Sequence, residues 1–395
     1  MRRAAATVAA LLLASAAHAQ TNDHFFRSWR FASDPVTARA AGMGGAVIAL
    51  PDDTGGIEQN PANLTSLGKT EIAASLRTTA AAGASYPDRA PSQPDSFAGG
   101  SALSFAGAAG RIGSRWAVGV SYQGTRRTRI ELGPRRLPDG LTDEGTLETS
   151  FETLSLAGAW HLGRSLHVGA RLGGAHASAE GAYRREAVGR AAELRVDTSG
   201  GSTRLAGALG IAWEAASAVR LAASATSGAT FALDREAVSP AQDVTLDAGS
   251  RYRLRQPAVI GAGAWVRASR HVTVLGQLDR VRYGEIQSNL SIRQGAVARS
   301  DYALEDAWEP RAGVEVSLPF RSVSLQLRGG WQRAGAGGLR YTGTDAVEAA
   351  SFLGAPAHGA FSAGASLATR SFRFDLAGVT SDPGTQVLAG ISGRF

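Results

Sequence analysis

The chain has 395 residues, a formal net charge of +7 and no cysteine. The lack of cysteine excludes a thiol catalyst and a cysteine-ligated metal site, and the spread of arginine along the chain argues against nucleic-acid binding. Glycine, with 49 residues, is abundant and suits closely packed strands and turns.

The first nineteen residues have the three parts of a secretory signal. A basic start at Arg2-Arg3 is followed by an apolar stretch over residues 4–16 and by a cleavage site at Ala17-His18-Ala19. The apolar stretch is thirteen residues long, and a helix needs roughly 20 to span a bilayer. We therefore predict that residues 1–19 form a signal peptide and that the chain has no transmembrane helix.

The segment from Ala38 to Leu64 has neither the apolar spacing of a helix nor the alternation of a strand. It is rich in glycine and small apolar residues, with turn signals at Pro51-Asp52-Asp53 and at Asn60-Pro61. We interpret this pattern as a compact, bent segment, and we assign it to a unit formed by residues 20–67.

From residue 68 onward, apolar and polar residues alternate with the period of a strand. Fourteen such segments follow one another, near residues 71–78, 103–109, 115–125, 149–160, 165–178, 201–213, 218–229, 254–267, 271–284, 306–318, 322–333, 361–367, 372–378 and 387–395. Short connections alternate with long polar ones near residues 79–100, 129–148, 179–200, 230–253, 285–305 and 334–357. Short turns on one rim, long loops on the other and an even strand number are typical of an outer-membrane barrel.

We therefore predict that residues 68–395 form an all-β, 14-stranded antiparallel transmembrane barrel. A soluble sandwich is the alternative, but its strands are usually shorter, about five or six residues. One face of the predicted strands carries charges that we place in the lumen, namely Glu71, Arg77, Arg171, Arg328, Arg373, Asp375 and Arg394. The third segment has aromatic residues, Trp116 and Tyr122, toward its two ends, as in an aromatic girdle.

A barrel of this size has a lumen too wide for its wall side chains to fill. Residues 20–67 precede the first strand, and we predict that they form a plug inside it. Gly42, Gly44 and Gly45 would let this segment approach the wall closely. Asp52, Asp53 and Asn60 can cap turns or bond arginine side chains in the lumen.

A family resemblance follows from three short motifs: Ala41-Gly42-Met43-Gly44-Gly45-Ala46, Asp52-Asp53 and Asn60-Pro61-Ala62. Together they resemble the N-terminal hatch of the FadL/OmpP1/TodX outer-membrane transporters and of the related PorV/PorQ group. The resemblance implies a 14-stranded barrel with an N-terminal hatch, here residues 20–67. The hatch or gating residues that it implies are Arg39, Gly42, Met43, Gly44, Gly45, Asp52, Asp53, Asn60 and Pro61.

The resemblance also implies uptake of hydrophobic molecules, such as long-chain fatty acids or aromatic hydrocarbons, in the outer membrane of a Gram-negative-type bacterium. In that family, substrates leave sideways through the wall beside a kinked third strand. The third segment here, residues 115–125, contains Gly119 and Gly124 but no pattern that predicts a bulge.

Two functions from different classes remain open. The first is a passive outer-membrane channel for hydrophobic small molecules. The second is a PorV-like scaffold or shuttle that holds secreted proteins and has secretion-system proteins as partners. Deletion of residues 20–67, with uptake and protein co-purification as readouts, would separate the two.

No enzyme, metal site or cofactor is predicted. The histidines are scattered, and the sequence contains neither a G-x-S-x-G elbow nor an H-E-x-x-H helix. The expected partners are a hydrophobic ligand, outer-membrane lipids or lipopolysaccharide whose phosphates pair with loop arginines, and the barrel-assembly machinery. The terminal Phe395 resembles the C-terminal aromatic residue that serves such barrels as an assembly signal.

Overall fold

The structure is a computed structural model that describes residues 35–80, 82–84, 95–136, 141–186, 192–239, 244–288, 299–335, 338–346, 349, 353–355, 357–381 and 384–395. The predicted signal, residues 1–19, and residues 20–34 of the predicted hatch lie outside the described residues. No helix within the described ranges is both long and apolar enough to span a membrane.

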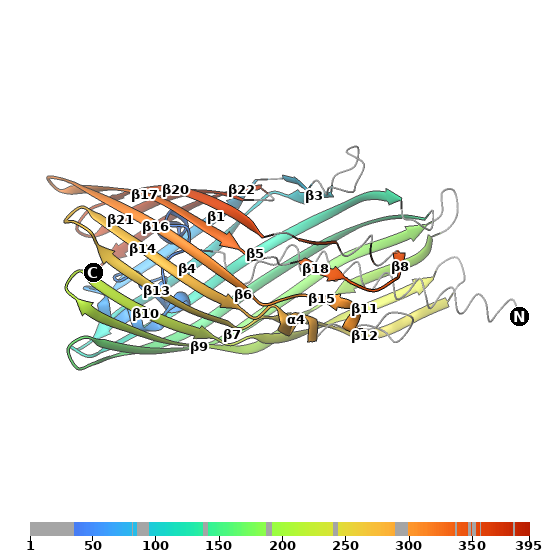
Figure 1. The fold of residues 1–395 in the computed structure, drawn as a ribbon, viewed down its shortest axis with the longest axis horizontal. Helices are drawn as coiled ribbons and strands as arrows, with labels where there is room; N and C mark the ends of the chain where they lie inside the picture. The colour runs from blue at the N-terminus through green and yellow to red at the C-terminus, as the bar shows by residue number, and fades with distance from the viewer. Residues whose placement is uncertain are drawn as a thin grey trace, which may run out of the picture.

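Fourteen antiparallel strands form the wall of a closed barrel (Figure 1). In order around the barrel they are β1 (Glu71–Thr79), β4 (Gly100–Ile112), β5 (Trp116–Arg136), β6 (Thr142–Leu162), β7 (Leu166–Glu186), β9 (Gly201–Ala216), β10 (Val219–Thr226), β13 (Val259–Arg267), β14 (Val272–Val281), β16 (Ala307–Phe320), β17 (Val323–Ala334), β20 (His358–Ala368), β21 (Phe372–Ser381) and β22 (Gly384–Arg394). The barrel closes because β22 pairs with β1, from Glu71↔Arg394 to Thr79↔Gln386. The prediction of a closed 14-stranded barrel is confirmed.

The outer face of the wall is apolar and the inner face is polar or small. On β6, Leu154 and Leu156 are 62% and 68% exposed, whereas the alternating Ser155 and Ala157 are buried. The predicted lumen charges, with Arg328 and Asp375 as examples, are buried inside the cylinder, except for Arg394, which is half-buried. A closed wall with every central strand paired and an oily exterior is the form in which β-structure spans a bilayer.

Exposed aromatic side chains gather near the short-turn rim: Trp116, Trp160, Trp213, Phe320, Phe372 and Phe395. Trp116 and Trp160 stack face to face on neighbouring strands, with ring centroids 5.2 Å apart. Phe395 itself is 68% exposed, and its backbone N–H donates to Thr70 O. These residues form the girdle expected where the wall leaves the hydrocarbon.

Several segments predicted as long loops are strands, so that part of the prediction is wrong. Strands β5 and β6 run through residues 129–148, and residues 179–200 hold the end of β7 together with β8 (Ala192–Ser199). Residues 230–253 belong to β11 (Ala229–Ser239) and β12 (Val244–Gln256). These strands continue beyond the apolar band, where the outward residues are polar and the apolar ones, such as Leu147 and Phe231, are buried on the inner face. Their polar composition therefore hid the alternation that identified the other strands.

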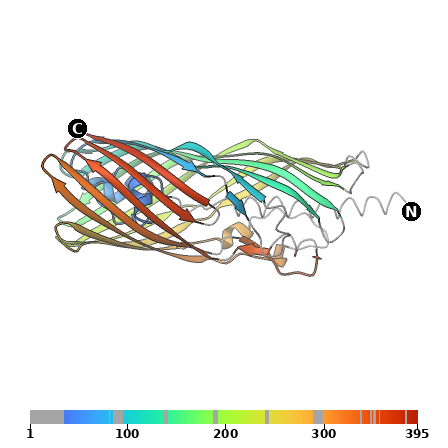
Figure 2. The ribbon, with the colours of Figure 1, turned by 90° about the horizontal axis from the view of Figure 1, so that it is seen from above.

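Shorter elements complete the long-loop end (Figure 2). The hairpin strands β2 (Ala82–Ala84) and β3 (Asp95–Ala98) extend the sheet, and β3 pairs with β5. A separate small sheet contains β15 (Tyr302–Ala303), β18 (Gly338–Tyr341) and β19 (Leu353–Ala355). It is accompanied by the helix α4 (Gly284–Ser288) and the 3-10 turn η3 (Arg299–Asp301).

Residues 35–67 of the hatch lie inside the barrel near its short-turn end (Figures 1 and 2). They form α2 (Ala38–Gly42), α3 (Gly56–Gln59) and the 3-10 helix η1 (Pro61–Ser66). Thr37 caps α2 by accepting a hydrogen bond from Ala40 N, and Asn60 caps η1 by accepting one from Ala62 N. Turns and caps of this kind, which avoid long helices, let the chain fold compactly within the lumen.

Candidate functional site

Glycines on both sides bring the hatch into backbone contact with the wall. Gly44 has a φ of +63°, a conformation that L side chains rarely adopt, and a Cβ there would lie 2.6 Å from Trp331 N. On the wall, a Cβ on Gly330 would lie 2.1 Å from Gly44 N, and one on Gly313 would lie 2.5 Å from Met43 O. The Met43-Gly44 turn therefore fits the wall only because these positions lack side chains.

A second contact between hatch and wall lies at the Asn60-Pro61 turn, on the opposite side of the barrel. The Asn60 amide donates to Ile48 O within the hatch, at 2.9 Å, and to Ile211 O on β9, at 3.2 Å. A Cβ on Gly210 would lie 1.9 Å from Asn60 Oδ1, and one on Gly169 would lie 2.5 Å from Ala62 N. Asn60 thus fixes the hatch internally and against the wall.

Polar wall side chains satisfy the remaining hatch groups. Gln277 Oε1 accepts from Val47 N and Ile48 N, at 2.8 and 2.9 Å. The buried Glu58 carboxylate pairs with Arg171 and accepts from the Ser121 hydroxyl at 2.7 Å. Buried polar groups are stabilising only when paired in this way.

Six buried charges form a closed ring between hatch and wall. In order they are Asp53, Arg39, Glu315, Arg328, Asp375 and Arg373, and the last returns to Asp53. We call this set the ion-pair ring. The hatch supplies Arg39 and Asp53, and the wall supplies the other four.

Within the ion-pair ring, Arg39 holds Glu315 through two hydrogen bonds of 3.2 and 3.3 Å, and it lies 3.4 Å from Asp53. The wall pair of Arg328 with Glu315 is 2.7 Å long. Burial opposes the charge on Arg39, but Glu315 and Asp53 more than offset this, so the pKa of Arg39 is raised above its ordinary value. The ring keeps its charges, and lifting the hatch would separate Arg39 from Glu315 and Asp53 from Arg373.

Asp52 lies beside the ring on the short-turn side of the hatch. Its φ of +56° is in the left-handed region, which costs free energy for a residue other than glycine. Arg394 compensates by donating to Asp52 Oδ2 at 2.8 Å and to its backbone O at 3.2 Å. The same guanidinium pairs with Glu71 at 2.6 Å, which ties this turn to the first and last strands.

His167 illustrates a site that resembles catalytic chemistry in composition alone. Its Nδ1 lies 2.6 Å from Thr65 Oγ1 and its Nε2 lies 3.3 Å from Glu214. Thr65 is buried, also donates to Ala62 O, and does not line either cavity described beside the hatch below. The contact therefore secures η1 to β7, and the described residues contain no group of three ligands suited to a metal ion.

Two cavities lie on opposite sides of the hatch. The first, of about 90 Å³, is on the long-loop side and is lined by Ile48 and Glu58 of the hatch and by Phe151 of the wall. The second, of about 670 Å³, is on the short-turn side and includes Asp52 and Arg394 in its lining. The hatch therefore separates two compartments of the lumen.

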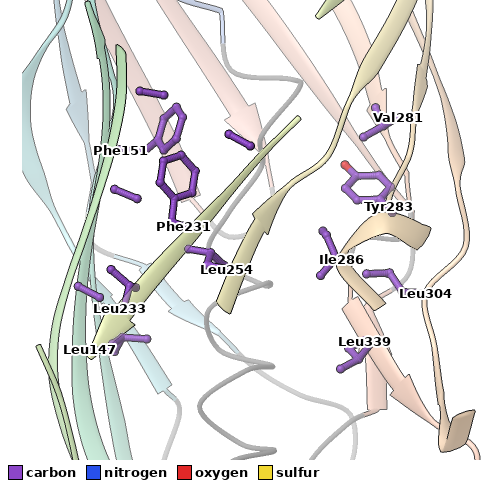
Figure 3. Packing of buried hydrophobic residues seen from close by; sticks show 14 of the residues in the cluster. Leu147, Phe151, Phe231, Leu233, Leu254, Val281, Tyr283, Ile286, Leu304 and Leu339 are labelled. Atoms are coloured by element: carbon purple, nitrogen blue, oxygen red, sulfur yellow. The ribbon is translucent and has the colours of Figure 1, made fainter. Parts of the chain in front are cut away.

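On the long-loop side of the hatch, buried apolar side chains form one cluster, which we call the apolar chamber. One group comes from the wall strands β6 to β12: Leu147, Phe151, Ala175, Ala177, Ala179, Ala206, Ala229, Phe231, Leu233 and Leu254. The facing group comes from the end of β14 and the loops beyond: Val281, Tyr283, Ile286, Tyr302, Leu304, Leu339 and Tyr341. Figure 3 shows labelled members of both groups, with the rings of Phe151 and Phe231 beside each other. The sequence did not reveal the apolar chamber, because each of its larger wall residues stands alone between polar or small neighbours.

The wall ladder is interrupted beside this chamber. Strand β4 pairs with β5 only up to Phe105↔Gln123, and the β5 register against β6 shifts between Gly124 and Arg126. The expectation that the third strand lacks a bulge is therefore wrong. A bulge inserts one residue and reverses the alternation, and the run of polar residues after Gly124 concealed that reversal.

A third cavity, of about 480 Å³, lies at this interruption. Its lining includes Leu103, Tyr122, Gly124 and Glu152, which share the outward phase of the wall. Phe151 lines both this cavity and the 90 Å³ cavity over the hatch. Its ring makes an edge contact with Phe231 at a centroid distance of 5.6 Å.

A second interruption lies between β9 and the junction of β10 with β11. Pairing stops at Ala208↔Thr226 and resumes between β8 and β11 at Ser199↔Asp234. Here Arg204 bridges the two sides by donating from Nε to Thr230 O at 3.0 Å. The two interruptions thus differ, since one carries a cavity and the other a side-chain bridge.

Comparison with known proteins shows the fold. No family model and no curated protein matches the chain. A FadL homologue from Pseudomonas aeruginosa matches with a TM-score of 0.69 at 11% identity, covering 91% of this chain and 98% of its own. The Ralstonia pickettii toluene transporter TbuX matches at 0.68 and 14%, covering 92% and 100%, and the Pseudomonas putida toluene transporter TodX at 0.66 and 11%, covering 92% and 99%.

The chain has the FadL fold. The resemblance inferred from the hatch motifs is confirmed at the level of the fold. In the structure, Met43, Gly44, Asn60 and Pro61 lie in the turns that contact the wall. Sequence reasoning missed the wall partners Gln277 and Glu315, because nothing local distinguishes them from other polar residues of a lumen face.

Proposed function

We propose that the protein is an outer-membrane channel for passive uptake of hydrophobic small molecules. The observation that carries the proposal is the apolar chamber, which ends at a hatch bonded to the wall on all sides. Apolar solutes entering from the long-loop side would move from water into this chamber. The transfer is favourable by a free energy of about 25 cal/mol per Å² of apolar surface buried. Solved relatives described as toluene transporters and a monoaromatic hydrocarbon channel support a cargo of this class.

The proposed path leaves the chamber sideways. A straight path would require the hatch to leave the ion-pair ring, and separating one partner from a buried pair costs about 3–5 kcal/mol. The interruption between β4 and β5 needs no such separation, and Phe151 lies between the chamber and the cavity there. We therefore assign the exit to this interruption rather than to the β9–β11 interruption, which Arg204 bridges.

The uptake of labelled toluene and labelled oleate by cells producing the protein tests this function. Phe151→Asn with Phe231→Asn places amides in the chamber and should lower uptake of both probes at least about tenfold, because apolar cargo then meets polar surface. The matched variant Phe151→Leu with Phe231→Leu keeps the chamber apolar and should retain uptake. If both variants transported like the parent protein, the chamber would have no role in transport.

A PorV-like scaffold remains the second candidate. The observation in its favour is the length of β5, β6 and β7, each 21 residues, which extends the wall well beyond the apolar band as a polar surface. Co-purification of a secreted protein together with unchanged uptake in the asparagine variant would favour this role over transport.

A further inference from the structure

The short-turn end of the barrel carries a strong positive charge. Five of its six short turns hold an exposed arginine: Arg115, Arg164, Arg270, Arg321 and Arg370. No acidic residue occurs in the described turns themselves, which span residues 113–115, 163–165, 217–218, 268–271, 321–322 and 369–371. This end therefore attracts anions over a distance of about a Debye length, ~8–10 Å.

The positive charge is concentrated inside the opening of the barrel at its short-turn end, which we call the mouth. The 670 Å³ cavity beneath the hatch is lined by five cationic side chains, namely Lys69, Arg220, Arg267, Arg370 and Arg394. Two carboxylates, Asp52 and Glu214, line it as well. The lining thus has an excess of three positive charges.

The excess resides on three side chains. Arg394 pairs with Asp52 and Glu71, and Arg220 lies 3.5 Å from Glu214 and donates to Asn63 Oδ1. For Lys69, Arg267 and Arg370, the described part of the chain offers no carboxylate within ion-pair distance. Like charges around one cavity repel, and an entering polyanion would relieve that repulsion.

We propose that this mouth cavity is the docking site for an acidic segment of a soluble partner protein on the short-turn side of the membrane. The lining comes from opposite sides of the barrel wall, with Lys69 and Arg267, and from the hatch, with Asp52. A phospholipid headgroup is held at the outer face of the wall by its acyl chains and does not reach this interior. A single small anion would neutralise one of these three cations, of which Arg267 also lies 5.2 Å from the Trp265 ring centroid, whereas a run of carboxylates neutralises all three.

Docking here would also act on the hatch. Asp52 is kept in its left-handed conformation by Arg394, which lines the same cavity. If a partner carboxylate paired with Arg394 in place of Asp52, the Asp52 turn would lose two hydrogen bonds. The proposal concerns the charge of the mouth and does not depend on the cargo proposed above.

The test measures binding of a fluorescein-labelled polyglutamate peptide to the full chain in phosphatidylcholine nanodiscs, by fluorescence anisotropy. Polyglutamate should bind, polyglutamine should not, and affinity should fall as salt is raised. Lys69→Gln, Arg267→Gln and Arg370→Gln together should weaken binding about tenfold or more, because three facing charges are lost. Arg111→Gln, Arg115→Gln and Arg164→Gln remove the same charge outside the cavity and should weaken it less than about threefold.

The single lysine of the sequence, Lys69, gives a second readout. A water-soluble carbodiimide joins a peptide carboxylate to a nearby amine as an amide, so mass spectrometry should find polyglutamate on Lys69. Equal loss in the two triple variants, absence of coupling at Lys69, or equal competition by acetate would each overturn the proposal. Thermal unfolding of each variant checks that the barrel is folded.

Discussion

Phe151 is the side chain on which the proposed path depends most directly. It lines both the cavity over the hatch and the cavity at the β4–β5 interruption, and it is packed against Phe231. Phe151→Ala would join the two cavities, because the ring that separates them is removed. We expect hydrophobic-probe uptake to rise about threefold or more if passage past this ring limits the rate, since that corresponds to about 0.7 kcal/mol of barrier.

Phe151→Trp provides the opposing variant, because a larger ring at the same place should slow uptake. Radiolabelled toluene uptake by intact cells measures both changes. Phe231→Ala, which removes the neighbouring ring that does not line the 480 Å³ cavity, is the matched control. Slower uptake in Phe151→Ala, or faster uptake in Phe151→Trp, would remove Phe151 from the path.

Arg39 is a hatch side chain that forms ion pairs with both the hatch and the wall. Arg39→Ala leaves Glu315 and Asp53 facing each other without the cation between them, and truncating one partner of a buried pair costs about 3–5 kcal/mol. We expect the hatch to loosen and the open-channel conductance in planar bilayers to rise. The double variant Arg39→Ala with Glu315→Gln also removes the wall carboxylate that Arg39 paired with, and it should recover part of the seal. A conductance that stays at the parent level in Arg39→Ala would show that the ion-pair ring does not hold the hatch.

Residues of the hatch were predictable where the backbone imposes a local requirement. Gly44 was identified from its glycine-rich surroundings and has the positive φ that glycine permits, and Asn60 before Pro61 caps a turn as expected. Glu315 and Arg39 are 276 positions apart in sequence. Their pairing depends on how the barrel closes, which no local pattern encodes.

Among the elements, the β4–β5 interruption makes the sharpest prediction. Because the chain has no cysteine, an engineered cysteine pair has no other thiol to react with. Ala102 and Arg126 stand opposite each other when the register Phe105↔Gln123 is continued, so Ala102→Cys with Arg126→Cys should close the interruption on oxidation. We expect uptake to fall at least about fivefold when oxidised and to recover on reduction, because a closed disulfide holds the Cα atoms within about 7 Å.

The matched control is a disulfide at the other interruption, from Arg204→Cys with Thr230→Cys. The hydrogen bond from Arg204 Nε to Thr230 O already spans this interruption. Oxidation there should leave uptake near the parent value. If this second lock blocked uptake and the first did not, the exit would lie between β9 and β11.

Strands were predictable where one face meets lipid, and not beyond it. Leu154 and Leu156 alternate with small or polar residues because their surroundings differ completely on the two faces of β6. Past the apolar band, the outward residues of β6, such as Glu148 and Ser150, are polar, and the inward Leu147 and Phe151 belong to the apolar chamber, so the alternation reverses within the same strand. A bulge such as that after Gly124 is a defect in pairing, which depends on the neighbouring strand and not on the strand's own sequence.

For the whole molecule, the charges of the wall decide what the barrel becomes without its hatch. Around the ion-pair ring and the Asp52 turn, the wall cations Arg328, Arg373 and Arg394 are matched by the wall anions Glu71, Glu315 and Asp375. The wall is therefore close to neutral by itself in this region, and it can pair internally when Arg39 and Asp53 are absent. The barrel does not need the hatch for its closure, which rests on the β1–β22 ladder.

Deletion of residues 20–67 should accordingly give a folded barrel with a water-filled lumen. We expect a steady, ohmic conductance in planar bilayers where the parent protein is closed, because 14 strands enclose more space than wall side chains fill. Selective uptake of hydrophobic probes should be lost, since small polar solutes would pass as well. The control replaces Asp52, Asp53 and Asn60 with alanine, which leaves the hatch backbone in place but removes its capping and pairing groups, so its conductance should lie between those of the parent and the deletion. A deletion protein that is folded by thermal unfolding yet remains closed would mean that something other than the hatch seals the lumen.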